Sequence, residues 1–453
     1  MSATSFIGPA RSRLSTLARG GTASIVANSA FTNALRIVSS MTLTRLLSAE
    51  AFGVVGVVVT MAMIFHMLSD IGLYPFIVRH ENGNDRRFLD EVWTLRLGRS
   101  AFQTAVMAAL AWPAAAFMGK PALGPILAVF SISFLIEGVS SLAFATAVRE
   151  QKLWRLTMLE TAGAALQLVF SVAVALWTRS SWSLVAGMLL AAAVRSILSY
   201  TMFPGSGRRL RVSGARAREL WAFSRFIALS SFLSLVILQA DKLVLARLMP
   251  LDAYGHYVIA ATLATAPLPL AYGYAQRVLY PAYADAAREG PGRLAEIFYA
   301  KRRTVLLAFM LAAGGLAGGA QLVVRVLYDP RYAEVAPLLS LLAISTALYL
   351  SNAAAEEALV ATGRTRWTLY ANVTRVTWLA AGGLFALLRY NPIQLVLVVG
   401  LVEAAAAACA WAGLKRIGVL RPVEELLGLG AVAAGTAAGW GVAQAAAVLL
   451  PGL

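Results

Sequence analysis

The sequence predicts an all-α, polytopic membrane protein. Of its 453 residues, 59% are hydrophobic and only 13% are charged, and the mean hydropathy is +0.71. Soluble domains carry about 25% charged residues, so lipid must surround most of this chain. Apolar stretches also recur along the whole sequence, each near the length of roughly 20 residues that a helix needs to cross a bilayer core.

These stretches predict about 13 transmembrane helices, because backbone groups in hydrocarbon must pair within their own segment. Pro267 and Pro269 predict a break in the eighth segment. The expected segments are 22–46, 52–78, 99–118, 122–147, 156–177, 183–203, 221–248, 254–276, 304–326, 334–361, 367–388, 393–414 and 426–450.

The basic residues predict the orientation. The chain has a formal net charge of +17, and its Lys and Arg residues gather in short linkers, mainly 204–220 and 277–303. They form no basic face with interleaved aromatic residues, so they do not indicate nucleic-acid binding. Lys and Arg favour the cytoplasmic side of a membrane. We therefore expect a multi-pass protein of the bacterial inner membrane with a cytoplasmic N-terminus.

An internal repeat indicates two similar halves. Residues 45–53 read RLLSAEAFG and residues 247–255 read RLMPLDAYG, an offset of 202 (247 − 45). Both copies fall between the first and second helix of a run of six, which predicts two six-helix lobes related by a pseudo-two-fold axis. The expected parts are a basic N-terminus 1–20, an N-lobe 21–203, a basic linker 204–220, a C-lobe 221–414 and an accessory C-terminal helix 415–453.

The stretch RLLSAEAFGVVG…LSDIGLYPFIVR, at 45–79, and the later LQADKLVLARLMPLDAYGHYVIA resemble the polysaccharide transporter family of the MOP superfamily. This family contains the Wzx-type O-antigen and exopolysaccharide flippases, which are related to MATE multidrug exporters and peptidoglycan-lipid flippases. The resemblance implies a flippase for a polyprenyl-pyrophosphate-linked oligosaccharide that works by alternating access. The alternative is a MATE-like, ion-coupled exporter of organic cations.

The first segment carries a polar face that includes Asn33, Arg36 and Ser40, at steps of three and four. Arg36 lies near mid-helix, where an arginine is costly unless it meets a wet cavity or a partner. The two interpretations are a cationic substrate cavity and a structural ion pair with Asp70 or Glu137. In the resembling lipid flippases, arginines on the first and eighth helices line such a cavity, and the positions of Arg36 and Arg277 match those helices.

Two further cations, Lys242 and Arg375, are candidates for the same cavity, because a guanidinium grips phosphate oxygens bidentately. Asp70, Asp241 and Glu356 are candidates for ion coupling. Each carboxylate has an equally good alternative as the partner of a nearby basic group, and Asp241 with Lys242 can form a local interfacial pair.

The remaining features exclude several functions. The single cysteine and three scattered histidines offer no metal site, and no Gly-rich phosphate loop ending in Lys-Ser/Thr occurs. We therefore expect no cofactor and no enzymatic activity. The expected partners are the lipid-linked oligosaccharide, membrane lipid, H+ or Na+ as the coupling ion, and polysaccharide polymerase or export proteins.

Overall fold

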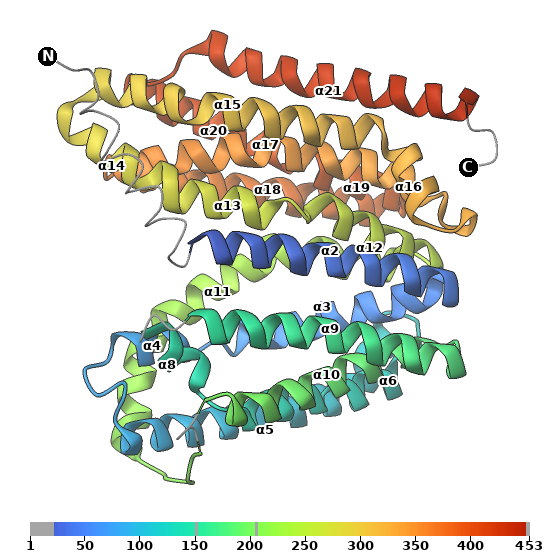
Figure 1. Cartoon of the computed structure of the whole chain (residues 1–453), viewed down its shortest axis with the longest axis vertical. Helices are drawn as coiled ribbons and strands as arrows, with labels where there is room; N and C mark the ends of the chain where they lie inside the picture. The colour runs from blue at the N-terminus through green and yellow to red at the C-terminus, as the bar shows by residue number, and fades with distance from the viewer. Residues whose placement is uncertain (1–21, 150–152, 204–206, 450–453) are drawn as a thin grey trace, which may run out of the picture. The chain divides into compact units, whose positions relative to one another are not determined.

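The structure, a computed structural model, describes residues 22–149, 153–203 and 207–449. Within these ranges the chain consists of helices and connecting turns (Figure 1). Each of the predicted apolar segments coincides with one or more of the helices, so the all-α prediction is confirmed for the described residues.

The chain divides into two compact units. Unit 1 comprises residues 1–46 and 61–234, and unit 2 comprises residues 47–60 and 235–453. Two boundaries fall inside the helices α3 (Ala49–Leu68) and α11 (Gly214–Leu248). Helix α11 begins at Gly214, inside the expected linker 204–220, and the first turns of α3 belong to unit 2.

Unit 1 is built from α2 to α10 with parts of α3 and α11. Asp85 starts the long helix α5 by accepting the backbone N–H of Phe88 at 3.3 Å, which satisfies one of the free amides of the first turn. The helices other than α3 and α11 are α2 (Thr22–Leu46), α4 (Leu73–Arg79), α5 (Arg86–Phe117), α6 (Leu123–Phe130), α7 (Ile132–Val139), α8 (Ala143–Arg149), α9 (Leu153–Thr178) and α10 (Ser181–Thr201).

Unit 2 is arranged around α17, which packs against α12, α15 and α20. The predicted break of the eighth segment is confirmed, because α12 ends before Pro267. The elements are α12 (Leu251–Thr265), α13 (Leu268–Tyr274), the π-helical turn η1 (Ala275–Leu279), α14 (Tyr280–Glu289), α15 (Pro291–Gly318), α16 (Ala320–Leu327), the 3-10 turn η2 (Pro330–Tyr332), α17 (Val335–Ala361), α18 (Arg366–Arg389), α19 (Pro392–Gly400), α20 (Val402–Arg416) and α21 (Pro422–Leu449).

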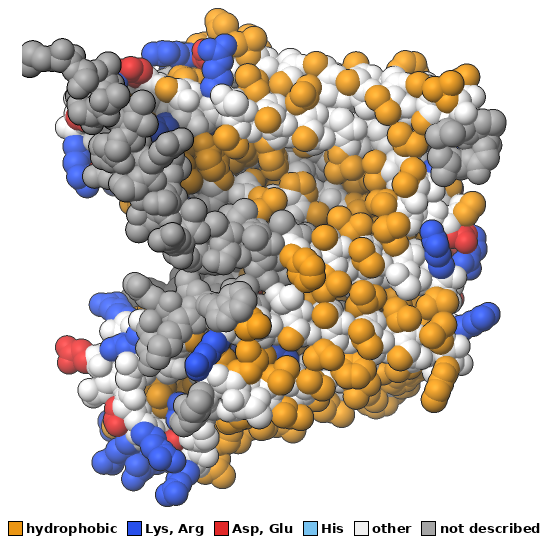
Figure 2. Space-filling model, viewed as in Figure 1, with side chains coloured by type: hydrophobic (Ala, Val, Ile, Leu, Met, Phe, Trp, Pro, Cys, Tyr) orange, Lys and Arg blue, Asp and Glu red, His pale blue; other side chains and the backbone are white. Residues whose placement is uncertain are grey.

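Among the described residues, nine helices are long and apolar enough to cross a membrane, or ten if α15 and α16, bent by 71°, form one span. The predicted segments 22–46, 122–147 and 221–248 are helical but are not among them. Segment 122–147 is divided among α6, α7 and α8. Figure 2 shows hydrophobic side chains over the sides of the helices, with most Lys and Arg side chains near the helix ends, as expected for a chain in lipid.

The C-terminal helix α21 packs closely along α15. A Cβ added to Gly314 or Gly318 would overlap the carbonyl oxygen of Val432 or Thr436, respectively. Small residues at a spacing of four allow two membrane helices to approach at their backbones. The expected C-terminal helix is thus present as α21, packs within unit 2, and is long and apolar enough to be a span.

The two copies of the internal repeat contact each other reciprocally inside unit 2. A Cβ on Gly53 would overlap the carbonyl oxygen of Leu251, and a Cβ on Gly255 would overlap that of Ala49. Both relations join residues at the repeat offset of 202 (255 − 53 and 251 − 49). Such an exchange is what a local two-fold axis between the start of α3 and α12 requires.

This crossing predicts a stability effect. We expect Gly53→Ala and Gly255→Ala each to lower the melting temperature of the purified protein in detergent, because the added methyl group forces two backbones apart at a cost of about 1–3 kcal/mol. Gly430→Ala is the control, since a Cβ at this position in α21 meets nothing within 4 Å. Equal melting temperatures for all three variants would contradict the close crossing.

Candidate functional site

The polar face predicted on the first segment lies on α2. The side chains of Asn33 and Arg36 lie outside the described residues, whereas Ser40 is half-buried on the same helix. Glu137, one of the two carboxylates considered as a partner of Arg36, lies 3.7 Å from the guanidinium of Arg195. The role of Arg36 therefore stays a prediction.

The second considered partner, Asp70, lies in the turn between α3 and α4. Its Oδ1 accepts the backbone N–H of Gly72 at 2.9 Å, and its Oδ2 accepts the hydroxyl of Ser231 at 3.0 Å. Gly72 has a φ of 59°, which lies in the left-handed region that favours glycine. Asp70 thus shapes this turn and ties it to α11 within unit 1.

Two arginines of α5 that the sequence reading did not single out bind the ends of neighbouring helices in unit 1. Arg96 donates to the hydroxyl of Ser140, after α7, at 2.7 Å. Arg99 donates to the hydroxyl of Ser69 and to the carbonyl of His66, both at 3.4 Å, at the end of α3. The last carbonyls of a helix have no partner within it, and these guanidinium groups provide donors there.

Arg149, at the end of α8, likewise donates to free carbonyl oxygens at the end of α4. Its guanidinium donates to the carbonyl oxygens of Ile77, Val78 and Glu81 at 3.2, 2.9 and 3.1 Å. The expected segments 52–78 and 99–118 leave residues 79–98 between them, whereas α5 already begins at Arg86. The signal that marks this helix is the spacing of Arg96, Arg99 and Gln103, which share one helical face.

In unit 2, the predicted pair of Asp241 and Lys242 lies near the end of α11. The hydroxyl of Tyr257 donates to Oδ2 of Asp241 at 2.6 Å, and Nζ of Lys242 lies 3.6 Å from Oδ1. Asp241 is buried, and among the described residues its Oδ1 accepts no hydrogen bond. Lys242 also donates to the carbonyl of Leu238. The geometry fits the local pair considered from the sequence.

Arg375 and Glu356 lie together in a buried network between α17, α18 and α20. The Nη1 of Arg375 lies 2.9 Å from Glu356, and its Nη2 lies 2.8 Å from Glu403. Asn352 donates a third bond to Glu403 at 2.7 Å. Glu356 thus has the arginine partner considered from the sequence, and its role in ion coupling stays a prediction.

A second buried network connects α15, α17 and α21. Arg302 is 1% exposed and binds Glu425, which also accepts the hydroxyls of Tyr299 at 3.0 Å and Ser351 at 3.3 Å. The guanidinium lies 3.9 Å from the centre of the Phe298 ring. Arg302 lies within the expected linker 277–303, and the structure places it in α15, which begins at Pro291, several turns before the apolar stretch.

Arg277 lies in the π-helical turn η1, where the chain continues from the broken eighth segment. It is exposed and forms no ion pair within the described residues. Its neighbour Gln276 donates to Glu357 of α17. Among the cations predicted for a cavity whose side chains are described, Arg277 is thus the one that lacks a carboxylate partner.

Comparison with known proteins gives a family and relatives. The family model of "Polysaccharide biosynthesis protein" matches residues 42–337. The succinoglycan biosynthesis transport protein ExoT of Rhizobium meliloti (strain 1021) is 25% identical over 69% of this chain and 62% of its own length. The lipopolysaccharide biosynthesis protein WzxC of Escherichia coli (strain K12) is 22% identical over 68% and 63%. The match therefore spans less than two thirds of the length of these two relatives.

Solved structures show which fold this is. The lipid II flippase MurJ in an inward closed conformation matches with a TM-score of 0.71 and 11% identity, over 90% of both chains. An inward-facing MATE multidrug resistance transporter of the MOP superfamily matches with a TM-score of 0.63 and 16% identity, over 85% of this chain and 94% of its own.

The family model covers more than half of the chain, and the helices follow the architecture of the MOP superfamily. The family predicted from the sequence motifs is thereby confirmed. The chain is a multi-pass membrane protein that belongs to the polysaccharide biosynthesis protein family.

Proposed function

We propose that this protein moves a polyprenyl-pyrophosphate-linked oligosaccharide from the cytoplasmic to the periplasmic leaflet of the inner membrane. The observation that carries the proposal is the family match, together with a relative named as a succinoglycan biosynthesis transport protein. In the proposed arrangement, the N-terminus is cytoplasmic, and thirteen spans form two six-helix lobes and a last helix.

The substrate chemistry sets what a cavity must provide. A pyrophosphate carries negative charge, and hydrocarbon cannot replace its hydration, so a path across the membrane needs water and cationic donors. We propose that Arg36 binds this group, with Asn33 and Ser40 on the same face of α2. Lys242 and Arg277 are the proposed further contacts, and the two lobes alternate access around the site.

The buried carboxylates of unit 2 argue against the rival function, a MATE-like exporter of organic cations. Such a site needs carboxylates that are free to meet a cationic drug. Glu403 is held by Arg375 and Glu425 is held by Arg302, at buried positions. Replacing these basic partners with a drug would leave an arginine unpaired in a low-dielectric interior, which is costly.

We further propose that Glu356 carries the coupling proton. With both carboxylates ionised, Glu356, Glu403 and Arg375 have a net charge of −1, which one proton would neutralise. Glu403 accepts bonds from Arg375 and Asn352, whereas the ion pair with Arg375 is the contact that holds Glu356, whose side chain is 19% exposed. Nη1 of Arg375 also donates to Asn372 at 2.9 Å, so protonation of Glu356 would free one N–H of this nitrogen to bind a phosphate oxygen. Asp70 and Asp241 are the other candidates.

The first prediction concerns Arg36. We expect Arg36→Ala to reduce transport of a radiolabelled polyprenyl-pyrophosphate oligosaccharide into proteoliposomes by about tenfold to a hundredfold. This is the effect expected from the loss of one charge-assisted hydrogen bond to the substrate. Arg36→Lys should retain part of the activity, because it keeps the charge but not the bidentate fork.

The matched control is Arg45→Ala, which removes an exposed arginine from the end of the same helix. If Arg36→Ala and Arg45→Ala transport equally well, Arg36 does not bind the substrate. If the unmodified protein moves cationic dyes but no lipid-linked sugar, the exporter is the correct function.

The second prediction concerns coupling. We expect Glu356→Gln to fold and to exchange substrate at equilibrium, but to lose the acceleration that an imposed pH gradient gives, because an amide does not titrate. Glu357→Gln, at the next position on α17, contacts Gln276 rather than Arg375 and should keep the full response. A pH-gradient response in Glu356→Gln as large as that of the unmodified protein would rule this residue out and leave Asp70→Asn and Asp241→Asn to be measured.

A further inference from the structure

A groove runs along the C-terminal helix in unit 2, between α21 and the bent pair α15–α16. Its volume is about 660 Å³. Small and apolar side chains dominate its lining, which includes Ala433, Ala437 and Trp440 of α21 and Ala317 and Gly318 of α15. Trp440 is 61% exposed, so the groove is open to the surroundings of the helices.

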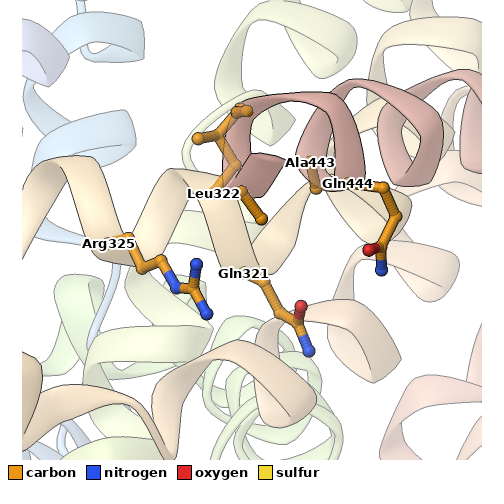
Figure 3. A pocket seen from close by; sticks show the side chains of 7 residues that line it. Gln321, Leu322, Arg325, Ala443 and Gln444 are labelled. Atoms are coloured by element: carbon orange, nitrogen blue, oxygen red, sulfur yellow. The ribbon is translucent and has the colours of Figure 1, made fainter. Parts of the chain in front are cut away.

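The groove ends at a smaller and more polar pocket. This pocket has a volume of about 100 Å³ and is lined by Gln321, Leu322, Arg325, Ala443, Gln444, Ala446 and Ala447. Gln321 lines the groove as well. Figure 3 shows that Gln321 and Arg325 project from α16 and Gln444 from α21 around this pocket. The apolar groove and the polar pocket therefore form one continuous surface.

Arg325 gives the pocket its charge. Within the described residues, no carboxylate lies close enough to Arg325 to form an ion pair with it. An unpaired arginine on a membrane helix needs water or an anion. A guanidinium and two carboxamide groups line this pocket, and they match a phosphate, which accepts two parallel bonds from arginine.

The dimensions of the groove match one leaflet of a bilayer. Ala433 and Gln444 are eleven residues apart on α21, and a helix rises 1.5 Å per residue, so they lie about 16 Å apart along its axis. Half of a hydrocarbon core about 30 Å thick is about 15 Å. A lipid with its phosphate at Arg325 would thus place an acyl chain along the groove as far as the bilayer centre.

We propose that this surface binds one anionic phospholipid, with the headgroup phosphate on Arg325, Gln321 and Gln444 and one acyl chain along α21. The bend of 71° between α15 and α16 makes room for it, because α16 leaves the line in which α15 packs on α21. The proposal concerns a bound membrane lipid and does not depend on which substrate the protein transports.

The test is a titration of delipidated protein in detergent with phosphatidylglycerol, with bound lipid counted by native mass spectrometry. We expect one lipid to bind tightly, and Arg325→Ala to weaken its binding about tenfold. Ala437→Phe should weaken it as well, since the larger side chain fills the groove while leaving the charge. Melting temperatures show that both variants are folded.

Two matched controls separate this site from general lipid adhesion. Arg389→Ala removes a different exposed arginine, which lies over the ring of Phe385, and Ala438→Phe enlarges an exposed residue of α21 that does not line the groove. Both should bind phosphatidylglycerol as the unmodified protein does.

Several results would overturn the proposal. One is unchanged lipid affinity in Arg325→Ala, and another is an equal loss in Arg389→Ala. Inorganic phosphate that binds as tightly as the lipid would indicate a site for free anions, and diacylglycerol that binds as tightly would show that the phosphate is not recognised. A second copy of the chain that displaces the lipid would make the groove an interface between protomers.

Discussion

Each break in a helix leaves carbonyl oxygens without amide partners, and hydrocarbon supplies no water to replace them. Unit 1 contains several such breaks, at the ends of α3, α4 and α7, and at each of them an arginine donates to the exposed backbone or to a neighbouring hydroxyl. Arg99, Arg149 and Arg96 fill these positions. Part of the net charge of +17 is therefore a consequence of broken helices, because a cation bound to a carbonyl adds no compensating negative charge.

In unit 2, buried polar side chains are satisfied by ion pairs between helices. Arg302 with Glu425 connects α15 to α21, and Arg375 with Glu403 connects α18 to α20. A buried pair of this kind contributes little net stability, but loss of one partner leaves an uncompensated charge and costs several kcal/mol. Such pairs fix which helices are neighbours. Glu356 shares Arg375 with Glu403, so the proton proposed for Glu356 would act on a contact between these helices.

The sequence was sufficient for those features that depend on local composition. Apolar length predicted the helices, and the prolines at 267 and 269 predicted where one of them breaks. Pairing could not be predicted in the same way, because Arg302 and Glu425 are 123 residues apart and each is adjacent to other charges. The ninth segment was also predicted to begin at 304, where the continuous apolar stretch starts. Arg302 was therefore placed in the linker 277–303. Buried polar groups at the ends of long helices are invisible to hydropathy, which averages over them.

The two copies of the internal repeat are alike in their backbone contacts but differ in their polar side chains. Gly53 and Gly255 make equivalent contacts across the crossing of α3 and α12, so the two copies are alike in their backbone. The hydroxyl of Tyr254 lies 3.5 Å from that of Thr60, but the repeat-related residues are Phe52, which has no hydroxyl, and Thr262, which donates to the carbonyl of Val258. The second copy of the repeat therefore has a tyrosine hydroxyl, at Tyr254, that the first copy lacks. A site built on this symmetric frame is asymmetric, and the function of a residue in one half cannot be transferred to its counterpart 202 positions away.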